Sequence, residues 1–381
     1  MRGIMKLFLS YALISTLSLS IYIFNADADT IYVGSHEKYK SIQSAIDAAD
    51  NYDTILVRNG YYYENIHVYK SVTIESMHGY QYAHIISMRI DDHAIIITSS
   101  DVTIKGFSIS INRVWPPFTL ISLICLANNT DNCTIINNMI KGDVSKNNIG
   151  ILTYGSNNNI INHNLLYNLY CGVYINNSNN NIISHNIALY NINSGIEIIK
   201  SINNVVKSNT CSNNDRGIQI RDDSQHNKVL YNMCTYNTFS GLDVLSSDNN
   251  TVHHNTLNNN GISGRGGYGL YVVNGKDNVI YLNSIQYNTT TNVLSSLATN
   301  KWHSKNKLEY VYKHAVNSSH LGNYYSDHSH DDINEDGVTD SSYGVPGNDP
   351  YDEYPLTETH DGYTILWSGV VDTQATTSEV E

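Results

Sequence analysis

A short pattern of polar and apolar positions repeats through the middle of this 381-residue chain. Each copy has an asparagine, then a β-branched residue three places before a second asparagine, and about eight to ten residues later a glycine followed by apolar, variable and apolar positions. The asparagines are Asn164, Asn186, Asn209, Asn232, Asn255 and Asn283, and the glycines are Gly150, Gly172, Gly195, Gly217, Gly241 and Gly269. An interval of about 22 to 24 residues, longer in the last copy, indicates stacked repeat units rather than a globular fold.

The residue types favour one repeat architecture. Leucine is sparse, while Asn, Ile, Val, Thr and Tyr dominate, and this excludes a leucine-rich repeat. Short β-like runs such as 195–198 and 217–220 alternate with Asn/Ser/Gly clusters, and no window keeps a helical period. We therefore predict an all-β, right-handed parallel β-helix in which each repeat is one coil. Equivalent side chains then stack about 4.8 Å apart, so that buried asparagines can join their amides into a ladder.

The two ends of the chain differ from the coils. Residues 1–28 have a basic start, an apolar stretch and a small-x-small end, which predicts a cleaved secretory signal; an uncleaved anchor is the alternative. Residues 41–49 predict an amphipathic helix, with Ser41 as N-cap, that closes the first coil. We expect coils over 29–290, a C-terminal cap over 291–367 and a disordered tail over 368–381.

Charge is concentrated at the C-terminal end. The net charge is −13, and residues 314–381 hold fourteen Asp or Glu and no Lys or Arg. Without a basic face, a nucleic-acid partner is not expected. Asp332, Asn334, Asp336 and Asp340, with Gly337 at the turn, have the spacing of a calcium loop. Tyr343 stands where the bidentate glutamate is expected, so Asp349 or Asp352 would complete a structural calcium site; the alternative is an Asp/Asn-rich turn.

The segment after the coils carries the sequence Leu321-Gly-Asn-Tyr-Tyr-Ser-Asp327 and later Asp352-Glu-Tyr-Pro-Leu356. Together with the Asn/Ile coils, this resembles the NosD-type β-helix proteins of the pectin-lyase-like superfamily, common among secreted archaeal proteins. The resemblance covers about residues 30–356. It implies an extracytoplasmic protein, either a periplasmic accessory of a copper enzyme or a carbohydrate-binding or sugar-hydrolysing relative.

Function is expected in the variable position two places after each glycine, because the pleat turns that side chain away from the core. This row reads Leu152, Tyr174, Glu197, Gln219, Asp243 and Tyr271. Glu197 and Asp243 would lie about 9 to 10 Å apart, two strand spacings, at the upper edge of the separation in inverting glycosidases. The tyrosines could stack on sugar rings.

Charged residues cluster beside this row, and they are Asp215, Arg216, Arg221, Asp222 and Asp223. Such a cluster could bind calcium or an acidic sugar, or abstract a proton as in polysaccharide lyases. The loops 113–118 and 261–269 would wall a groove. Motifs of polygalacturonases are absent. The preferred hypothesis is a monomeric, exported protein that binds a polysaccharide without chemistry, through Tyr174, Gln219, Tyr271, Asp222 and Asp223.

Two other functions stay open. A lyase or glycoside hydrolase would use Glu197, Asp243, Asp215, Arg216 and Arg221 as catalytic residues. A copper-handling accessory would use histidines, since His163, His185 and His254 each precede a ladder asparagine, and His253 and the pair His328 and His330 lie close by in sequence. Solvent-exposed turn histidines are the plainer interpretation.

The five cysteines give no clear disulfide framework, because their number is odd. Cys211 and Cys234 share an inward repeat position and are expected to be stacked core thiols. A bond between Cys125 and Cys133 is left open.

Overall fold

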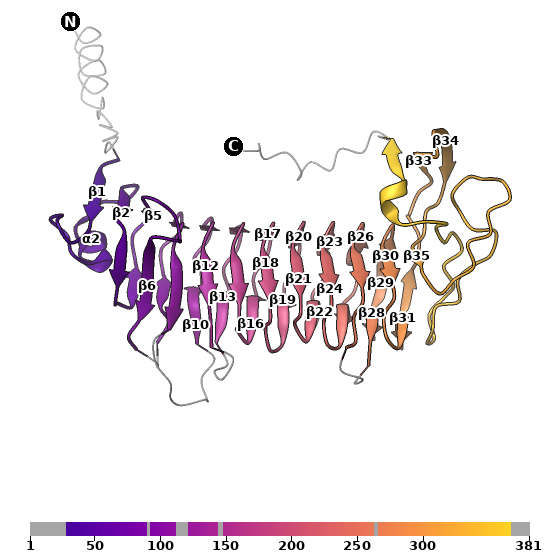
Figure 1. The fold of residues 1–381 in the computed structure, drawn as a ribbon, viewed down its shortest axis with the longest axis horizontal. Helices are drawn as coiled ribbons and strands as arrows, with labels where there is room; N and C mark the ends of the chain where they lie inside the picture. The colour runs from indigo at the N-terminus through magenta and orange to yellow at the C-terminus, as the bar shows by residue number, and fades with distance from the viewer. Residues whose placement is uncertain (1–27, 90–91, 112–120, 144–147, 263–265, 367–381) are drawn as a thin grey trace, which may run out of the picture.

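The computed structural model describes residues 28–89, 92–111, 121–143, 148–262 and 266–366. The described chain winds into a right-handed solenoid of parallel strands, as the repeat predicts (Figure 1). Three long parallel sheets run the length of the solenoid, with 12, 11 and 10 strands, and we call them sheets A, B and C.

Sheet A comprises β1 (Thr30–Val33), β2 (Thr54–Val57), β5 (Thr73–Ser76), β8 (Thr103–Lys105), β11 (Thr134–Ile136), β14 (Ile160–Asn162), β17 (Ile182–Ser184), β20 (Val205–Lys207), β23 (Lys228–Leu230), β26 (Thr251–His253), β29 (Lys276–Tyr281) and β32 (Thr299–Lys301). Sheet B comprises β3 (Gly60–Tyr62), β6 (Ala83–Ser87), β9 (Ser108–Ile111), β12 (Met139–Lys141), β15 (Leu165–Tyr167), β18 (Ile187–Leu189), β21 (Thr210–Ser212), β24 (Met233–Thr235), β27 (Thr256–Asn258), β30 (Ser284–Gln286) and β35 (Tyr324–Tyr325). Sheet C comprises β4 (Ile66–Val68), β7 (Ile95–Ile97), β10 (Ser122–Leu126), β13 (Ile149–Tyr154), β16 (Cys171–Asn176), β19 (Ser194–Ile199), β22 (Arg216–Arg221), β25 (Ser240–Leu245), β28 (Tyr268–Val273) and β31 (Thr291–Ser296).

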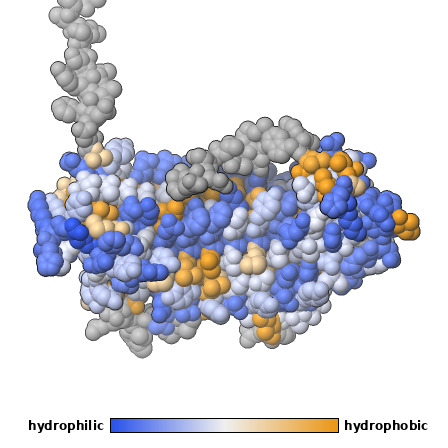
Figure 2. Space-filling view, turned by 45° about the horizontal axis from the view of Figure 1, so that its top comes forward, coloured by the Kyte–Doolittle hydropathy of each residue, from blue (hydrophilic) through white to orange (hydrophobic). Residues whose placement is uncertain are grey.

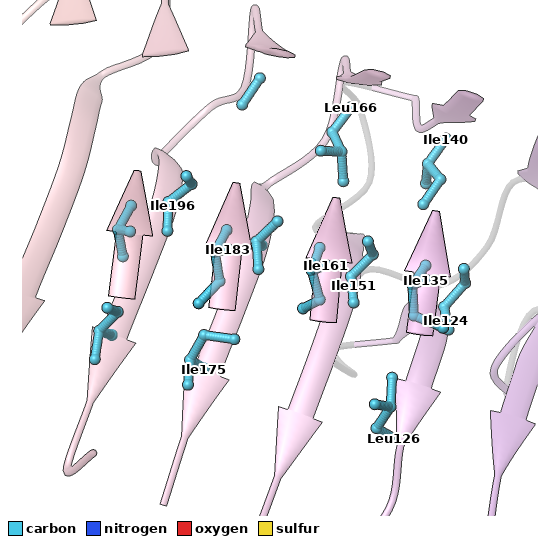
Figure 3. Close-up of a cluster of buried hydrophobic side chains, with 14 of the residues drawn as sticks. Ile124, Leu126, Ile135, Ile140, Ile151, Ile161, Leu166, Ile175, Ile183 and Ile196 are labelled. Atoms are coloured by element: carbon cyan, nitrogen blue, oxygen red, sulfur yellow. The ribbon is translucent and has the colours of Figure 1, made fainter. Parts of the chain in front are cut away.

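The core consists of aliphatic side chains stacked from coil to coil. Ile161 pairs in register with Ile135 on one side and Ile183 on the other, and all three are buried. Figure 3 shows such stacks from the three sheets pointing into one interior. Each buried side chain of this size contributes about 1.5–3 kcal/mol of transfer free energy, so the repeated stacking supplies the main driving force.

The predicted asparagine ladder is confirmed. From Asn138 to Asn323, each side-chain Nδ2 donates to the Oδ1 of the asparagine in the next coil at 2.8–3.1 Å. Two further ladders run beside it, one from Asn159 to Asn300 and one from Asn191 to Asn288. Polar side chains are tolerated in the interior because each amide is satisfied by its neighbours.

Each ladder ends on an aspartate. Every asparagine donates towards the C-terminal end, so the last one needs an acceptor that no further coil supplies. Asp352 accepts from Asn323, and Asp349 accepts from Asn300. The third ladder continues through Asn292 to Asp327. Both carboxylates are thus engaged at ladder ends in this structure, and a calcium shell completed by Asp349 or Asp352 stays a prediction.

The N-terminal end is closed by the predicted helix. Helix α2 (Ile42–Ala48) begins after Ser41, whose hydroxyl accepts a hydrogen bond from Ser44 N at 3.2 Å. Its apolar face, Ile42, Ala45 and Ile46, is buried against the first coil.

The C-terminal part packs on the other end of the solenoid (Figure 1). Strands β33 (Leu308–Tyr312), β34 (Ala315–Ser319) and β36 (Thr364–Leu366) form a small antiparallel sheet, and a 3-10 turn, η1 (His360–Gly362), precedes β36. Strands β31, β32 and β35 belong to the three parallel sheets although they lie after residue 290, where the sequence analysis ends the coils. Asp/Asn-rich loops connect these elements.

All five cysteines are buried and unbonded, so the Cys125–Cys133 disulfide that the sequence left open is not formed. Cys211 and Cys234 pair in register inside the core, as expected. The predicted signal segment and tail lie largely outside the described residues. Within the described ranges, no helix is long and apolar enough to cross a membrane.

Candidate functional site

The predicted row lies where the repeat places it, on the outward side of sheet C. Neighbouring strands pair Leu152 with Tyr174, Tyr174 with Glu197, Glu197 with Gln219, Gln219 with Asp243, and Asp243 with Tyr271. Glu197 and Asp243 are thus separated by one intervening strand, or about 9 to 10 Å at ordinary strand spacing.

The central residues of this row are not exposed, and the expectation that they face solvent is wrong. Glu197 and Asp243 are 1% and 0% exposed, and Gln219 is also buried. They point away from the solenoid core, but the guanidinium groups of Arg216 and Arg221 and neighbouring aromatic side chains cover them. Outward orientation therefore does not amount to accessibility here.

Both arginines come from β22 and reach in opposite directions along the solenoid. Arg221 Nε donates to Glu197 Oε1 in the preceding coil at 2.7 Å, and Arg216 Nε donates to Asp243 Oδ2 in the following coil at 2.9 Å. Each guanidinium also pairs with the aspartate next to it in sequence, Arg216 with Asp215 and Arg221 with Asp222. The predicted charged cluster thus forms two ion-pair networks, one around each arginine. In each network one carboxylate is buried, and the arginine and the other aspartate are partly exposed. Asp223 lies apart, exposed at the following corner.

Aromatic rings surround the Arg216–Asp243 pair. The Arg216 guanidinium lies 4.6 Å from the centre of the Phe239 ring, a cation–π contact. Tyr268 and Tyr271 stack with ring centres 4.9 Å apart and planes 17° apart, and Phe239 meets both edge-on at 5.5 Å. All three rings are partly exposed.

We call this surface the sheet-C platform. It comprises Tyr170, Tyr174, Glu197, Asp215, Arg216, Gln219, Arg221, Asp222, Phe239, Asp243, Tyr268 and Tyr271. It is a surface with aromatic rings at both ends and charged groups between them.

Burial controls the titration of the platform. It raises the pKa of Asp243 to about 6, although Ser240, Arg216 and Gln219 partly offset the effect. The pKa of Glu197 is also raised by burial, against the opposing influence of Arg221. Burial and the Glu197 charge raise the pKa of Tyr174 to about 12, so this phenol stays protonated at neutral pH.

One carboxylate oxygen is not satisfied. Among the described residues, Asp243 Oδ1 and the hydroxyl of Ser240 on the same strand form no hydrogen bond of normal geometry, although Ser240 lies close enough to lower the pKa of Asp243. Asp243 Oδ2, in contrast, accepts from Arg216 and from Gln219 at 3.3 Å. A buried acceptor of this kind needs an explanation, and a functional role is one of the possible explanations.

Sequence reasoning missed Phe239 and Tyr268. Tyr268 stands immediately before the repeat glycine, in register with Arg216 through Ser240. Side chains at this position join the platform, since Tyr268 stacks on Tyr271 and Arg216 reaches Asp243. A Cβ at Gly195 would lie 2.7 Å from Gly217 O, which explains why only glycine fits there.

The expected walls of the groove are only partly described. A Cβ at Gly266 would lie 3.0 Å from both the Phe239 and Tyr268 rings, so this residue of the predicted loop lies beside the platform. The predicted loop 113–118 lies outside the described residues.

Carboxylates of the proposed calcium ligands accept hydrogen bonds from backbone N–H groups of the same loop. Asp332 accepts from Gly337 N at 2.8 Å, Asp340 accepts from Ile333 N at 2.8 Å, and Asn334 donates to Asp336 at 3.1 Å. Within the described ranges, no group of three or more His, Cys, Asp or Glu side chains is placed to hold a metal ion. Calcium binding at this loop stays a prediction.

The histidines do not provide a copper site either. His163 and His185 are exposed, and their rings stack face to face, 4.9 Å apart and 5° from parallel, so ring faces rather than nitrogen lone pairs meet. His328 and His330 lie near backbone oxygens, at 3.0 Å from Ser341 O and 3.1 Å from Tyr325 O. His254 lies partly buried beside His253, and desolvation lowers its pKa to about 2. The described residues therefore do not fit a preformed copper centre.

Solved structures share this fold at low sequence identity. The enzymatically active domain of tailspike protein 2 from bacteriophage CBA120 superposes with a TM-score of 0.53 at 14% identity, over 76% of this chain and 51% of that one. A DFA-IIIase from Arthrobacter chlorophenolicus A6 gives 0.53 at 12% identity, over 71% and 81%. A GH136 lacto-N-biosidase from Eubacterium ramulus gives 0.51 at 13% identity, over 72% and 68%. The chain thus spans about half of the tailspike chain, and these likenesses establish the fold alone.

A comparison with curated proteins finds no match. A family model described as "Periplasmic copper-binding protein (NosD)" matches residues 109–330, from β9 through β35. This span includes the asparagine ladders, the whole sheet-C platform and part of the C-terminal region. The chain belongs to the NosD family.

Proposed function

We propose that this protein is an exported glycan-binding protein that holds a neutral sugar chain against the sheet-C platform without cleaving it. The observation that carries the proposal is the arrangement of Phe239, Tyr268 and Tyr271 around the Arg216–Asp243 ion pair. Partly exposed rings offer flat apolar faces to a sugar, and the polar groups between them offer hydrogen bonds that fix its orientation.

The charge of the platform argues for a neutral rather than an acidic glycan. Two guanidinium groups face four carboxyl groups, those of Glu197, Asp243, Asp215 and Asp222. The arginines are committed to these partners, so a uronic acid would meet excess negative charge and no free cation within the platform.

The burial of the two carboxylates supports binding without catalysis. A general acid or base must come within hydrogen-bond distance of the reacting sugar oxygen or of the attacking water. Glu197 and Asp243 are covered and tied to Arg221 and Arg216 at 2.7 and 2.9 Å. In this arrangement the carboxylates hold the arginines and rings in place.

The test is retention of polysaccharides by the purified protein, using β-glucan, mannan, galactan and an acidic polymer such as polygalacturonate. We expect retention of a neutral polymer, no new reducing ends or unsaturated sugars, and weaker retention by Tyr271→Ala. Tyr52→Asn is the matched control, because Tyr52 is 67% exposed at the N-terminal end and has a positive φ of 75° that asparagine adopts readily. Equal retention by Tyr271→Ala and Tyr52→Asn would overturn the proposal.

A lyase or glycoside hydrolase is the second candidate, and one observation favours it. Asp243 combines a pKa raised to about 6 with an unpaired Oδ1, as expected of a general acid that works near neutral pH. Products released by the wild type and abolished by both Asp243→Asn and Glu197→Gln would establish this function in place of binding alone. For copper, which the family description names, the described side chains support no proposal.

A further inference from the structure

The corner between sheets B and C contains a second series of repeated positions. One residue per coil there has a left-handed backbone, with φ between 53° and 57°. The residues are, in order, Asn168, Tyr190, Asn213, Tyr236, Asn259 and Tyr287. The first five occupy the same place, since each backbone N–H donates to the last residue of the sheet B strand in the next coil. Tyr287 N donates instead to Ser326 Oγ.

Asparagine and tyrosine alternate over these six coils, whereas Gly142 holds the equivalent place in the coil before them, where its backbone N–H donates to Tyr167 O. Asparagine is enriched in the left-handed region, whereas tyrosine carries a steric cost there. The corresponding corner between sheets A and B shows no alternation, since it holds Asn137, His163, His185, Ser208, Tyr231, His254 and Leu282. Tyrosine on every second coil is therefore not a requirement of the turn, and a strained backbone of this kind points to a role of the side chain.

The three tyrosines are among the most exposed aromatic side chains of the solenoid. Tyr190, Tyr236 and Tyr287 are 57%, 51% and 69% exposed. Packing in the core therefore does not explain them. Because successive coils are about 4.8 Å apart, the tyrosines recur about every 9.6 Å along the solenoid axis. That repeat is comparable to the length of one disaccharide unit in an extended polysaccharide.

We propose that Tyr190, Tyr236 and Tyr287 form a linear track that binds an extended neutral polysaccharide parallel to the solenoid axis, with one ring for every second coil. The inference rests on the proposed function for its ligand class and adds the direction and length of the bound chain. The intervening Asn213 and Asn259 present amide groups that can donate to and accept from sugar hydroxyls.

The track lies along one edge of the outward face of sheet C. Phe239 of the platform follows Tyr236 by three residues, and Asn193, which donates to Glu197 at 2.8 Å, follows Tyr190 by three. A polymer on the track would therefore pass beside the platform. Short fragments would contact the platform alone, while longer fragments would gain the tyrosines one after another.

The experiment compares the wild type with the triple variant Tyr190→Asn, Tyr236→Asn and Tyr287→Asn. Asparagine is the residue of the alternate coils, so the variant keeps the fold and should melt at an equal or higher temperature. The probes are fragments of neutral β-glucan, mannan and galactan from disaccharide to octasaccharide, with affinities from calorimetry. We expect wild-type affinity to rise with length and the triple variant to bind octasaccharide about tenfold more weakly, with disaccharide binding unchanged.

The outcomes separate the two proposals. The same increase with length in both proteins would overturn the track and leave platform binding intact. Binding of disaccharide that Tyr271→Ala does not weaken would contradict the platform, while loss of length dependence in the triple variant would still support the track. No binding of any fragment by the wild type would overturn both.

Discussion

Asp352, the end of the longest asparagine ladder, offers a sharp test of how the solenoid is closed. Its Oδ2 accepts from Asn323 N at 2.8 Å and from the Tyr325 hydroxyl at 3.1 Å, and its Oδ1 accepts from Tyr354 N at 3.1 Å. Asn323 Nδ2 also reaches Asp352, but it keeps two carbonyl acceptors, Ile280 O and Trp302 O. Asp352→Ala therefore leaves two fully buried donors, on Asn323 and Tyr325, without an acceptor.

Each buried donor that loses its partner costs about 1–3 kcal/mol. Removing a buried carboxylate offsets part of this cost, so we expect a net loss of about 3 kcal/mol in the C-terminal region. The loss should be local, since coils of a solenoid contact only their neighbours.

The charge of Asp352 adds a pH dependence. Burial raises its pKa from 3.8 to about 7. Between these values the folded carboxyl keeps a proton that the unfolded one has released, so stability falls as pH rises, by at most about 1.4 kcal/mol per pH unit. Asp352→Asn keeps an oxygen acceptor and should remove this slope.

The assay is amide hydrogen exchange. Exchange rates are corrected for their intrinsic values and converted into free energies of local opening. Peptides within 300–356 should open more readily in Asp352→Ala, while peptides from 180–250 should not change. Unchanged opening of 300–356, or a pH slope between about pH 4 and 7 that is the same in Asp352→Asn as in the wild type, would refute the reasoning.

Four further outcomes are expected. Arg216→Met should destabilise the fold by about 3–5 kcal/mol in urea unfolding, and adding Asp243→Leu should restore most of that loss; no recovery in the double variant would contradict the ion-pair assignment. The partly buried His254 stays neutral when folded and protonates when unfolded, so it contributes a loss of stability as pH falls below about 6.5, opposite in sign to the contribution of Asp352; His254→Asn should therefore lose less stability than the wild type in acid titration. Calcium should slow hydrogen exchange around residues 332–340 in the wild type but not in Asp332→Asn, and equal protection in both would argue for a plain turn. The five thiols should react with a thiol reagent only after unfolding, because all are buried; rapid reaction of the native protein would contradict the core.

The repeat predicts the fold because its period and its residue types act together. The β-branched residue three places before Asn164, and before its equivalent in each other copy, fills the core. The asparagine itself can be buried only if the coils stack in register. The same logic reaches the other two ladders, since Asn181, Asn204 and Asn227 recur at the same interval as Asn186 and Asn209. That signal is the first asparagine of each repeat copy, and the period alone does not say that this position is buried as well.

The order of residues along sheet C was predictable, but their burial was not. Pleating places Glu197, Gln219 and Asp243 on the outside, yet it does not say what covers them. The cover comes from Arg216 and Arg221, whose long side chains lie across the neighbouring strands, and such reach depends on side-chain conformation rather than on period.

The C-terminal aspartates show the same limit. The spacing of Asp332 to Asp340 suggests a metal, whereas the positions of Asp349 and Asp352 are set by the chain returning to the end of the solenoid. Only the three-dimensional arrangement reveals that these two carboxylates cap ladders.

The central claim is that a neutral glycan lies on the rings of the sheet-C platform, and oxidative footprinting tests it most directly. The protein is oxidised briefly with and without the retained polysaccharide, and modification of each tyrosine is measured by mass spectrometry. The account predicts that the glycan protects Tyr174, Tyr268 and Tyr271 and leaves Tyr52 unchanged. Equal oxidation of the three platform tyrosines with and without a bound glycan would contradict it.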